Sequence, residues 1–546
     1  MISFYKSKVR IKFFLLIIFF PIAARPQNPL VKIWDKRYGG DTTDYLNSFL
    51  QTRDGGYLLG GFSSSGMSGD KTQPLRDTSA TGFNKGDYWI VKTDSLGNKE
   101  WDKDFGGTRW DVLTSMQQTS DGGYILGGTS YSETSGDKTQ LLWGACDYWI
   151  LKLDSLGNKQ WDKDIGGGDD DRLSSVRQTK DNGYILGGTS YSGMSGLKTQ
   201  PNKGEYDYWI IKLNSLGIIQ WQKDYGGTLS DFLFSLELTN DNGYILGGYS
   251  LSGIGGDKTG YSNGDCDFWI IKVDSSGNFQ WDKDYGFGYT EWLSVITQTK
   301  DSGYIIGGST NSTTGGITWD FLVIKTDVNG TIEWSSTYGG TNNDELQNIT
   351  ETNDNGYLIT GDSYSPLSGN KSENNMGQEQ SWILKTDSLG NIKWDKTILT
   401  PGHDETGLGI QTKDNCYVIA NWNNGGIGGY KSEPVRGEWD YWLIKFCDST
   451  LVTNISLHDP GSYQGEDGSM ILYPNPVLNK FVVTGLSHTE SILIYNLVGE
   501  MVLNFHLQKA NCDLPTELDV HSLPSGIYFL EADAGERKNR TMFVKQ

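Results

Sequence analysis

Histidine, cysteine and proline are scarce in this chain of 546 residues, which contains 5 His, 5 Cys and 13 Pro. Only one histidine, His403, lies in the repeated part of the chain, so a copper or zinc site built from several imidazoles is not available there. Arginine does not recur at any one position of the repeat. This lack disfavours carboxylate recognition of the kind that sialidases use.

An excess of basic charge and a helical spacing of apolar residues are also missing. The formal net charge is −21, which argues against nucleic-acid binding and suits a soluble exported protein. Apolar residues do not recur with a period of 3.6, and Gly at 71 positions argues against helices. These absences leave an acidic, glycine-rich chain whose elements are expected to be strands.

A motif of about 60 residues is repeated seven times. Its Trp residues are Trp34, Trp101, Trp161, Trp221, Trp281, Trp334 and Trp394, at spacings of 67, 60, 60, 60, 53 and 60 residues. A fixed period in this range is typical of repeat architectures. Ten residues after each Trp stands an acid, namely Asp44, Asp111, Asp171, Asp231, Glu291, Asp344 and Asp404. Because a Tyr follows each Trp at a constant distance too, all length variation falls in one long loop before the D-Y-W-I-I-K segment.

Each repeat predicts four short strands. They are the Trp segment, the segment that begins at the acid, the Y-I-L-G-G segment and the D-Y-W-I-I-K segment, and turn signals such as D-G-G and D-S-L-G-N join them. The first Trp strand, V-K-I-W-D-K-R-Y, lacks its own D-Y-W-I-I-K partner, and the last such segment, 440–446, lacks a following Trp strand. Pairing of these two strands would close a ring and remove the exposed edges. We therefore predict an all-β, seven-bladed β-propeller with strand-exchange closure over residues 28–449; a linear stack of hairpins, which would need caps at both ends, is the alternative.

The order Y-I-L-G-G, long loop, D-Y-W-I-I-K, turn and Trp resembles the kelch repeat. It is also similar to propeller repeats of about 60 residues in secreted proteins of Bacteroidetes-type bacteria. The fifth repeat departs most, with a short loop and Leu322 in place of Trp, and the sixth has Gln380 and Ser381 where others have an acid and an aromatic residue.

One face of the predicted ring is the candidate binding site. Because strand direction alternates, the seven acids and the seven long loops emerge on this face, and binding residues concentrate on loops held by a rigid scaffold. The acids could contact a ligand, or each could cap local backbone N–H groups; the sequence leaves both open. Loop residues that differ between repeats are further candidates for recognition of sugar rings or peptide side chains: Trp143, Tyr206, Tyr261, Trp319, Arg436 and Trp439.

No catalytic constellation is present in the sequence. Carboxylate pairs for glycoside hydrolysis could be chosen from the acids, but any ring of seven acids offers such pairs. Oxygen-rich loops are compatible with Ca²⁺, yet no calcium-loop spacing occurs, and no cofactor or metal site is predicted. Of the cysteines, Cys416 and Cys447 fall on neighbouring predicted strands and are expected to form a disulfide.

The two ends of the chain predict export. Residues 1–27 have a basic start followed by an apolar run too short to span a bilayer, as in a signal peptide, so no transmembrane segment is expected after its removal; a membrane anchor is the alternative. Residues 450–470 are expected to be a polar linker, and alternation in 471–546 predicts a small Ig-like β-sandwich.

The last 76 positions resemble the type A C-terminal sorting domain of type IX secretion cargo. The resemblance is carried by Tyr473, Pro474, Asn475, Pro476, Gly499, Gly526, Tyr528 and Lys545. It implies recognition by the type IX secretion machinery and a location at the outer-membrane surface of a Gram-negative bacterium or in the medium; an ordinary Ig-like binding module is the alternative. The sequence thus favours an exported, non-catalytic module that binds an unidentified glycan or protein, with a polysaccharide hydrolase or lyase as the rival hypothesis.

Overall fold

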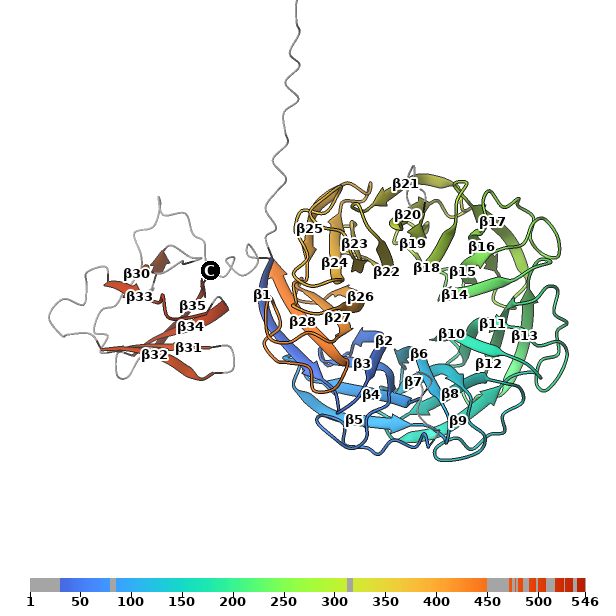
Figure 1. Cartoon of the computed structure of the whole chain (residues 1–546), viewed down its shortest axis with the longest axis horizontal. Coiled ribbons are helices and arrows are strands. Elements are labelled where there is room, and N and C mark those ends of the chain that lie inside the picture. The colour runs from blue at the N-terminus through green and yellow to red at the C-terminus, as the bar shows by residue number, and fades with distance from the viewer. Residues whose placement is uncertain are drawn as a thin grey trace, which may run out of the picture.

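The computed structural model describes residues 30–78, 85–311 and 318–448, and in the tail 471–473, 477, 480–484, 491–496, 499–506, 516–524, 526–533 and 538–545. All regular secondary structure in these ranges is β-strand (Figure 1). The expected signal peptide, the expected linker and Pro474, Asn475 and Pro476 lie outside the described residues. In the described ranges no helix is long and apolar enough to cross a membrane.

Residues 30–448 form seven antiparallel sheets of four strands each. Sheet 1 contains β2 (Asp44–Gln51), β3 (Tyr57–Ser63), β4 (Asp87–Thr93) and β5 (Lys99–Phe105); sheet 2 contains β6 (Asp111–Gln118), β7 (Tyr124–Ser130), β8 (Asp147–Leu153) and β9 (Lys159–Ile165). Sheet 3 contains β10 (Asp171–Gln178), β11 (Tyr184–Ser190), β12 (Asp207–Leu213) and β13 (Ile219–Tyr225); sheet 4 contains β14 (Asp231–Leu238), β15 (Tyr244–Ser250), β16 (Asp267–Val273) and β17 (Phe279–Tyr285).

The remaining three sheets follow the same order. Sheet 5 contains β18 (Glu291–Gln298), β19 (Tyr304–Thr310), β20 (Asp320–Thr326) and β21 (Ile332–Tyr338), and sheet 6 contains β22 (Asp344–Glu351), β23 (Tyr357–Ser363), β24 (Gln380–Thr386) and β25 (Ile392–Thr397). Sheet 7 contains β26 (Asp404–Gln411), β27 (Tyr417–Asn423), β28 (Asp440–Asp448) and β1 (Leu30–Tyr38). The sheets are arranged in a ring, with the acid strands β2, β6, β10 and β14 nearest its centre (Figure 1). The predicted all-β, propeller-like arrangement is confirmed.

The ring is completed by strands from opposite ends of this region. Strand β1 pairs antiparallel with β28, with Val31 opposite Cys447 and Tyr38 opposite Tyr441. The Tyr441 hydroxyl donates a 3.1 Å hydrogen bond to the Trp89 carbonyl of sheet 1. Sheet 7 is therefore made of the first strand and the last three, as the incomplete first and last repeats predicted.

Aromatic residues of the D-Y-W-I-I-K strands hold neighbouring sheets together. Tyr148 of sheet 2 and Trp209 of sheet 3 are fully buried, with ring centroids 5.1 Å apart. The Tyr148 hydroxyl donates to the Trp209 carbonyl at 3.2 Å, and Tyr208 repeats this bond to Trp269 of sheet 4 at 3.0 Å. Buried aromatic pairs of this kind contribute about 0.5–1.5 kcal/mol beyond their burial, so the repeated pair stabilises each contact between sheets.

In six of the seven sheets a buried side chain after the Trp anchors the long loop to its own sheet; it is an Asp in five of them and Gln222 in sheet 3. Asp162, directly after Trp161, accepts bonds from Thr139 N (2.8 Å) and Thr139 Oγ1 (2.6 Å) of the loop and from Trp149 Nε1 (3.3 Å) of the core. Sheet 5 has Leu322 at the Trp149 position and Ser335 at the Asp162 position, and its loop is the shortened one. Sheet 5 thus lacks the Trp, the acid and the loop motif together, whereas in sheet 3 the Gln222 side-chain oxygen still accepts bonds from Thr199 N and Trp209 Nε1, both at 3.1 Å.

The tight turns on the opposite face depend on residues that tolerate a left-handed backbone. Asn182 has φ 61°, and the Asp181 carboxylate accepts the Gly183 N–H at 3.1 Å and pairs with Lys212 Nζ at 2.9 Å. Short polar side chains satisfy backbone donors in this way in tight turns. The repeated Asp and Lys of these turns are structural.

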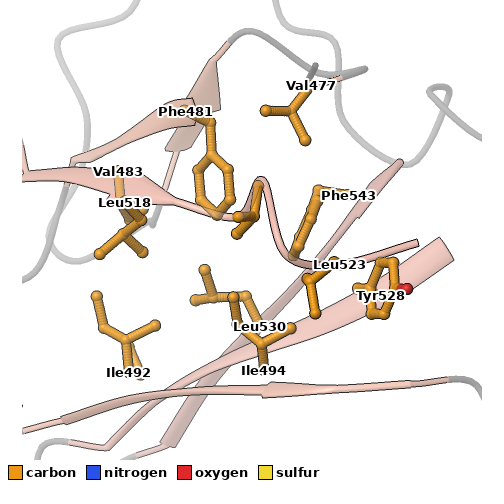
Figure 2. Packing of buried hydrophobic residues seen from close by; sticks show 12 residues of the cluster. Val477, Phe481, Val483, Ile492, Ile494, Leu518, Leu523, Tyr528, Leu530 and Phe543 are labelled. Carbon is orange, nitrogen blue, oxygen red and sulfur yellow. The ribbon is translucent and has the colours of Figure 1, made fainter. Parts of the chain in front are cut away.

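The tail forms two sheets around a separate apolar core. One contains β29 (Ile471–Tyr473), β30 (Lys480–Thr484) and β33 (Thr516–Asp519), and the other β31 (Ser491–Tyr495), β32 (Met501–His506), β34 (Gly526–Asp533) and β35 (Lys538–Lys545). Figure 2 shows Phe481, Phe543 and Leu530 packed between them, with the two Phe centroids 4.7 Å apart. Alternating apolar residues supply this core from both sheets, as the sequence pattern indicated.

Candidate functional site

The seven acids lie at the start of the innermost strands and are buried. Each is 0% exposed. Asp171 accepts the Gly167 N–H at 2.6 Å and the Ser192 hydroxyl at 2.9 Å. Asp44, Asp111, Asp231 and Asp344 likewise accept a Gly N–H from four residues before the acid and a Ser hydroxyl from 21 residues after it. This geometry fits the capping interpretation, and a surface ligand does not reach these carboxylates.

Burial shifts the protonation of these acids. It raises the pKa of Asp171 to about 6, against the lowering effect of the Gly167 and serine bonds, and raises the pKa of Glu291 to about 7. The backbone N–H of each acid donates to the residue that precedes the D-Y-W-I-I-K strand of the neighbouring sheet, for example Asp231 N to Tyr206 O at 2.6 Å. The acids therefore join sheet to sheet at this face.

The lysine of the G-D-K-T loops is buried as well. Lys138 Nζ lies 2.5 Å from Asp164 Oδ2, and both side chains are inaccessible to solvent. Lys71 with Asp104 and Lys198 with Asp224 repeat the pair at 2.5 and 2.6 Å. A buried cation of this kind is satisfied within the fold and is not offered to an anionic ligand.

Two runs of aromatic side chains occupy the same face. The first run crosses sheets 3 to 5, with successive centroids 4.3–6.4 Å apart: Tyr191, Tyr206, Phe232, Tyr249, Trp292 and Trp319, with Phe234 beside Tyr249. The second run crosses sheets 7, 1 and 2, with centroids 4.3–5.8 Å apart: His403, Trp439, Trp422, Tyr45, Phe62, Trp110 and Tyr131. Tyr191, Phe234 and Trp292 are 44–46% exposed. Together we call the two runs the aromatic face.

The six variable loop residues predicted for recognition lie in different places: Tyr206 is part of the first run, and Tyr261 is 81% exposed outside both runs. Trp319 stacks on Trp292 at 4.3 Å, and Trp439 packs on Trp422 at 4.6 Å, so both belong to the aromatic face. Arg436 forms an ion pair with Asp70 of the next loop and donates to the Gly39 carbonyl at 3.2 Å. Trp143 is 45% exposed on the loop of sheet 2, outside both runs. Arg436 thus serves the contact between sheets 7 and 1.

The sequence-based list missed most of the aromatic face. Phe232, Trp292 and Tyr45 stand directly after the buried acid, and Tyr249 and Trp422 stand one position before the end of the G-G strand. In register these two positions are cross-strand partners, as with Phe232 and Tyr249. The signal available in the sequence was the variation of residue type at these two strand positions from one repeat to the next. The sequence-based prediction considered only the loops and therefore missed these positions.

A shallow hollow adjoins the first run. It has a volume of about 350 Å³ and is lined by Thr318, Asn342, Asn343 and Tyr364. Its amide and hydroxyl groups are suited to hydrogen bonding beside the aromatic surface.

Cysteine residues play two parts. Cys416 and Cys447 form a disulfide that joins β28 to the start of β27 in the closing sheet. Cys146 and Cys266 are free and buried at equivalent positions of sheets 2 and 4, and burial raises the pKa of both thiols to about 11. Neither thiol is a candidate nucleophile, because nucleophilic thiols have lowered pKa values.

The described sorting-signal residues lie at turns and strand ends of the tail. Gly499 has φ 82°, a conformation that favours glycine, in the turn before β32. The Tyr528 hydroxyl donates to the Pro524 carbonyl at 2.9 Å, and Lys545 is buried at the end of β35. Gly526 begins β34 and Tyr473 ends β29.

Residues 471–546 match the family model of the secretion system C-terminal sorting domain. This sorting domain implies export by the type IX secretion machinery to the cell surface or the medium.

Comparison with known proteins says less about the ring. No curated protein matches the chain. Among solved structures, a protein of unknown function from Dyadobacter fermentans is 9% identical, covering 77% of this chain and 99% of its own, with a TM-score of 0.39. The Pan2 WD40 domain of Neurospora crassa is 11% identical, covering 65% and 94%, with a TM-score of 0.33. An apocarotenoid oxygenase mutant of Synechocystis is 10% identical, covering 72% and 89%, with a TM-score of 0.37. Likeness at this level supports no statement about function.

Proposed function

We propose that the chain is an exported seven-bladed β-propeller that binds carbohydrate or protein through the aromatic face. In this proposal residues 1–27 are a signal peptide, 28–449 the kelch-like propeller, 450–470 a linker and 471–546 an Ig-like sandwich that carries the sorting signal. The mature protein is held at the outer-membrane surface or released, and it needs no catalytic group or cofactor.

The observation that carries the proposal is the continuity of the aromatic face. Rings from three neighbouring sheets follow one another in the first run, ending in the stacked pair Trp292–Trp319. Trp292 leaves 46% of its surface exposed although apolar burial would stabilise the fold. Exposed Trp and Tyr give large, rigid contact areas with a polar edge, which is why they dominate binding hot spots.

The rival hypothesis, a polysaccharide hydrolase that uses the acid ring, has less support. A general acid must lie within hydrogen-bond reach of the glycosidic oxygen. All seven ring acids are fully buried and hydrogen-bonded inside the fold. Turnover assays on polysaccharides with wild type and with Asp171→Asn/Asp231→Asn test the rival directly: loss of turnover in a folded double variant would favour it over the binding module.

Glycan-array and pull-down binding test the proposal. We expect Trp292→Ala and Trp439→Ala each to weaken binding by roughly 30-fold, since truncation of a hot-spot aromatic residue costs about 2 kcal/mol. Phe279→Ala is the matched control, because Phe279 is 41% exposed at the start of β17, next to a tight turn on the opposite face. Binding that survives both Trp substitutions unchanged, or that falls equally in the control, would count against the aromatic face.

A further inference from the structure

Sheets 6 and 7 meet at a cluster that the rest of the ring lacks. Within the described parts of the chain, one group of three metal-ligating side chains lies close together: Glu379, His403 and Glu405, whose ligand atoms are all within 4.8 Å of one another. Glu379 directly precedes β24, His403 directly precedes β26 and Glu405 is the second residue of β26. At the equivalent contact between sheets 2 and 3 the three positions are Cys146, Asp170 and Arg172.

The separation of His403 and Glu405 matches that of two ligands that share one ion. His403 Nε2 lies 3.3 Å from Glu405 Oε1 and makes a close contact with Glu379 Oε2. Two ligand atoms each about 2.1 Å from a tetrahedral metal ion are about 3.4 Å apart. The Tyr364 hydroxyl lies 3.4 Å from His403 Nε2 and offers a further oxygen.

The cluster carries more negative charge than the protein itself neutralises. Two further carboxylates, Glu345 and Asp362, act on it, and in the described residues no Lys or Arg forms an ion pair with any of the four acids. The negative charges of Glu379 and Glu405 repel each other, and the Glu345 charge repels both. A bound cation would remove this repulsion.

The backbone around the cluster is held in an unusual conformation. Thr406, directly after Glu405, has φ 61°, where six other sheets place a buried Leu in the regular strand. The Asp362 carboxylate accepts the N–H groups of Thr406 at 2.9 Å and Gly407 at 3.2 Å, and Trp422 Nε1 donates to Thr406 Oγ1 at 2.7 Å. Non-glycine residues with positive φ persist where surrounding contacts fix them, and they concentrate at functional sites. Here Asp362 and Trp422 hold the backbone directly after Glu405.

We propose that Glu379, His403 and Glu405 bind one divalent first-row transition-metal ion, such as Zn²⁺, which joins sheets 6 and 7. One imidazole and two carboxylates form a mixed nitrogen–oxygen ligand set, which suits Zn²⁺ or Mn²⁺ better than Ca²⁺, whose ligands are oxygens. The His403 and Glu405 side chains are 21% and 34% exposed and that of Glu379 is 7% exposed, so an ion reaches a buried ligand through a partly open rim. The site lies at the end of the second run of the aromatic face, where His403 packs on Trp439, but its test measures metal binding and does not depend on a ligand of that face.

Equilibrium dialysis with metal analysis tests the site. The full chain is stripped with a chelator and dialysed against Zn²⁺, Mn²⁺ or Ca²⁺ alone. We expect about one Zn²⁺ per chain, with affinity reduced on the order of 100-fold or more in His403→Gln and in Glu405→Gln, because even the loss of a residue that only orients a ligand costs 10–100-fold. His521→Gln is the control, since His521 is an exposed histidine beside Asp519 in the tail.

Each result decides the proposal. Retention of one Zn²⁺ by the control and its loss in both cluster variants supports the site. No stoichiometric Zn²⁺ or Mn²⁺ in the wild type, equal binding by the cluster variants, or tighter binding of Ca²⁺ than of Zn²⁺ would overturn it. Circular dichroism without metal establishes folding, and Glu405→Gln, at the exposed rim, provides the comparison if His403→Gln does not fold.

Discussion

Replacing Asp162 by Ala should show how strongly one buried acid ties a long loop to the ring. Asp162 accepts two bonds from Thr139, one from the fully buried indole of Trp149 and one from Lys159 Nζ at 3.2 Å. An unsatisfied buried donor costs about 1–3 kcal/mol, and the bonds from Thr139 add about 0.5–1.5 kcal/mol each. Since Thr139 is exposed and its N–H can bind water, we expect a loss of roughly 2–4 kcal/mol in the free energy of unfolding.

Thermal unfolding followed by tryptophan fluorescence measures this loss. The unfolding entropy is about 2.1 cal/mol/K per residue, so a ring of roughly 420 residues loses roughly 2–5 °C in Tm for that free energy. Limited proteolysis of the loop between β7 and β8 gives a local readout, because loop release precedes global unfolding.

Sheet 5 supplies the internal control. Ser335 stands at the position of Asp162 but is exposed and has Leu322 in place of the indole. Ser335→Ala should therefore change stability by less than about 0.5 kcal/mol. The double variant Trp149→Leu/Asp162→Ser copies sheet 5, and it should be more stable than the sum of its single changes by roughly 1–2 kcal/mol. An Asp162→Ala protein as stable as Ser335→Ala, or a strictly additive cycle, would refute the reasoning.

Three further outcomes follow from the ring. Burial raises the pKa of Asp171 and of Asp231 to about 6 in the folded protein, above the unfolded value of about 3.9. The folded state therefore binds more protons, and the free energy of unfolding rises as pH falls from about 6 to about 4. The double variant Asp171→Asn/Asp231→Asn should lose part of the Tm difference between pH 8 and pH 5, and an unchanged difference would contradict this. Reducing the disulfide Cys416–Cys447, which spans 31 residues, should cost roughly 3–4 kcal/mol, and reductant should not change the Tm of the double Ala variant. Deleting residues 28–38 removes the partner of β28, so size-exclusion chromatography should show aggregates; a compact monomer with wild-type Tm would argue against closure by β1.

The repeat made most of the fold predictable from sequence. The constant offsets between Trp, acid and Tyr predicted the strands of the ring, and the incomplete first and last repeats predicted the pairing of β1 with β28. The candidate site was less predictable, because a residue present in every repeat, such as Asp171, serves the repeat itself and is buried. The residues on the aromatic face are the ones that vary, and their grouping depends on the contacts between sheets.

The Glu379–His403–Glu405 cluster shows a second limit of sequence reasoning. A single histidine in the ring argues against a site of several imidazoles. The histidine count did not address a metal site that combines one histidine with glutamates, because Glu379 and His403 are 24 residues apart and belong to different sheets. The backbone bond from Asp404 to the Glu379 carbonyl, at 3.1 Å, and the bonds of Gln380 to Thr400 and Asp404 bring the two positions together.

The pairing of Val31 with Cys447 has a consequence for the order of events in folding. No part of the polypeptide shorter than residues 30–448 contains a complete seventh sheet, so the first strand has no partner until the last one is present. Closing so long a loop is entropically slow compared with forming hairpins within one repeat. The circle can therefore be sealed only after both of its ends are in the same compartment.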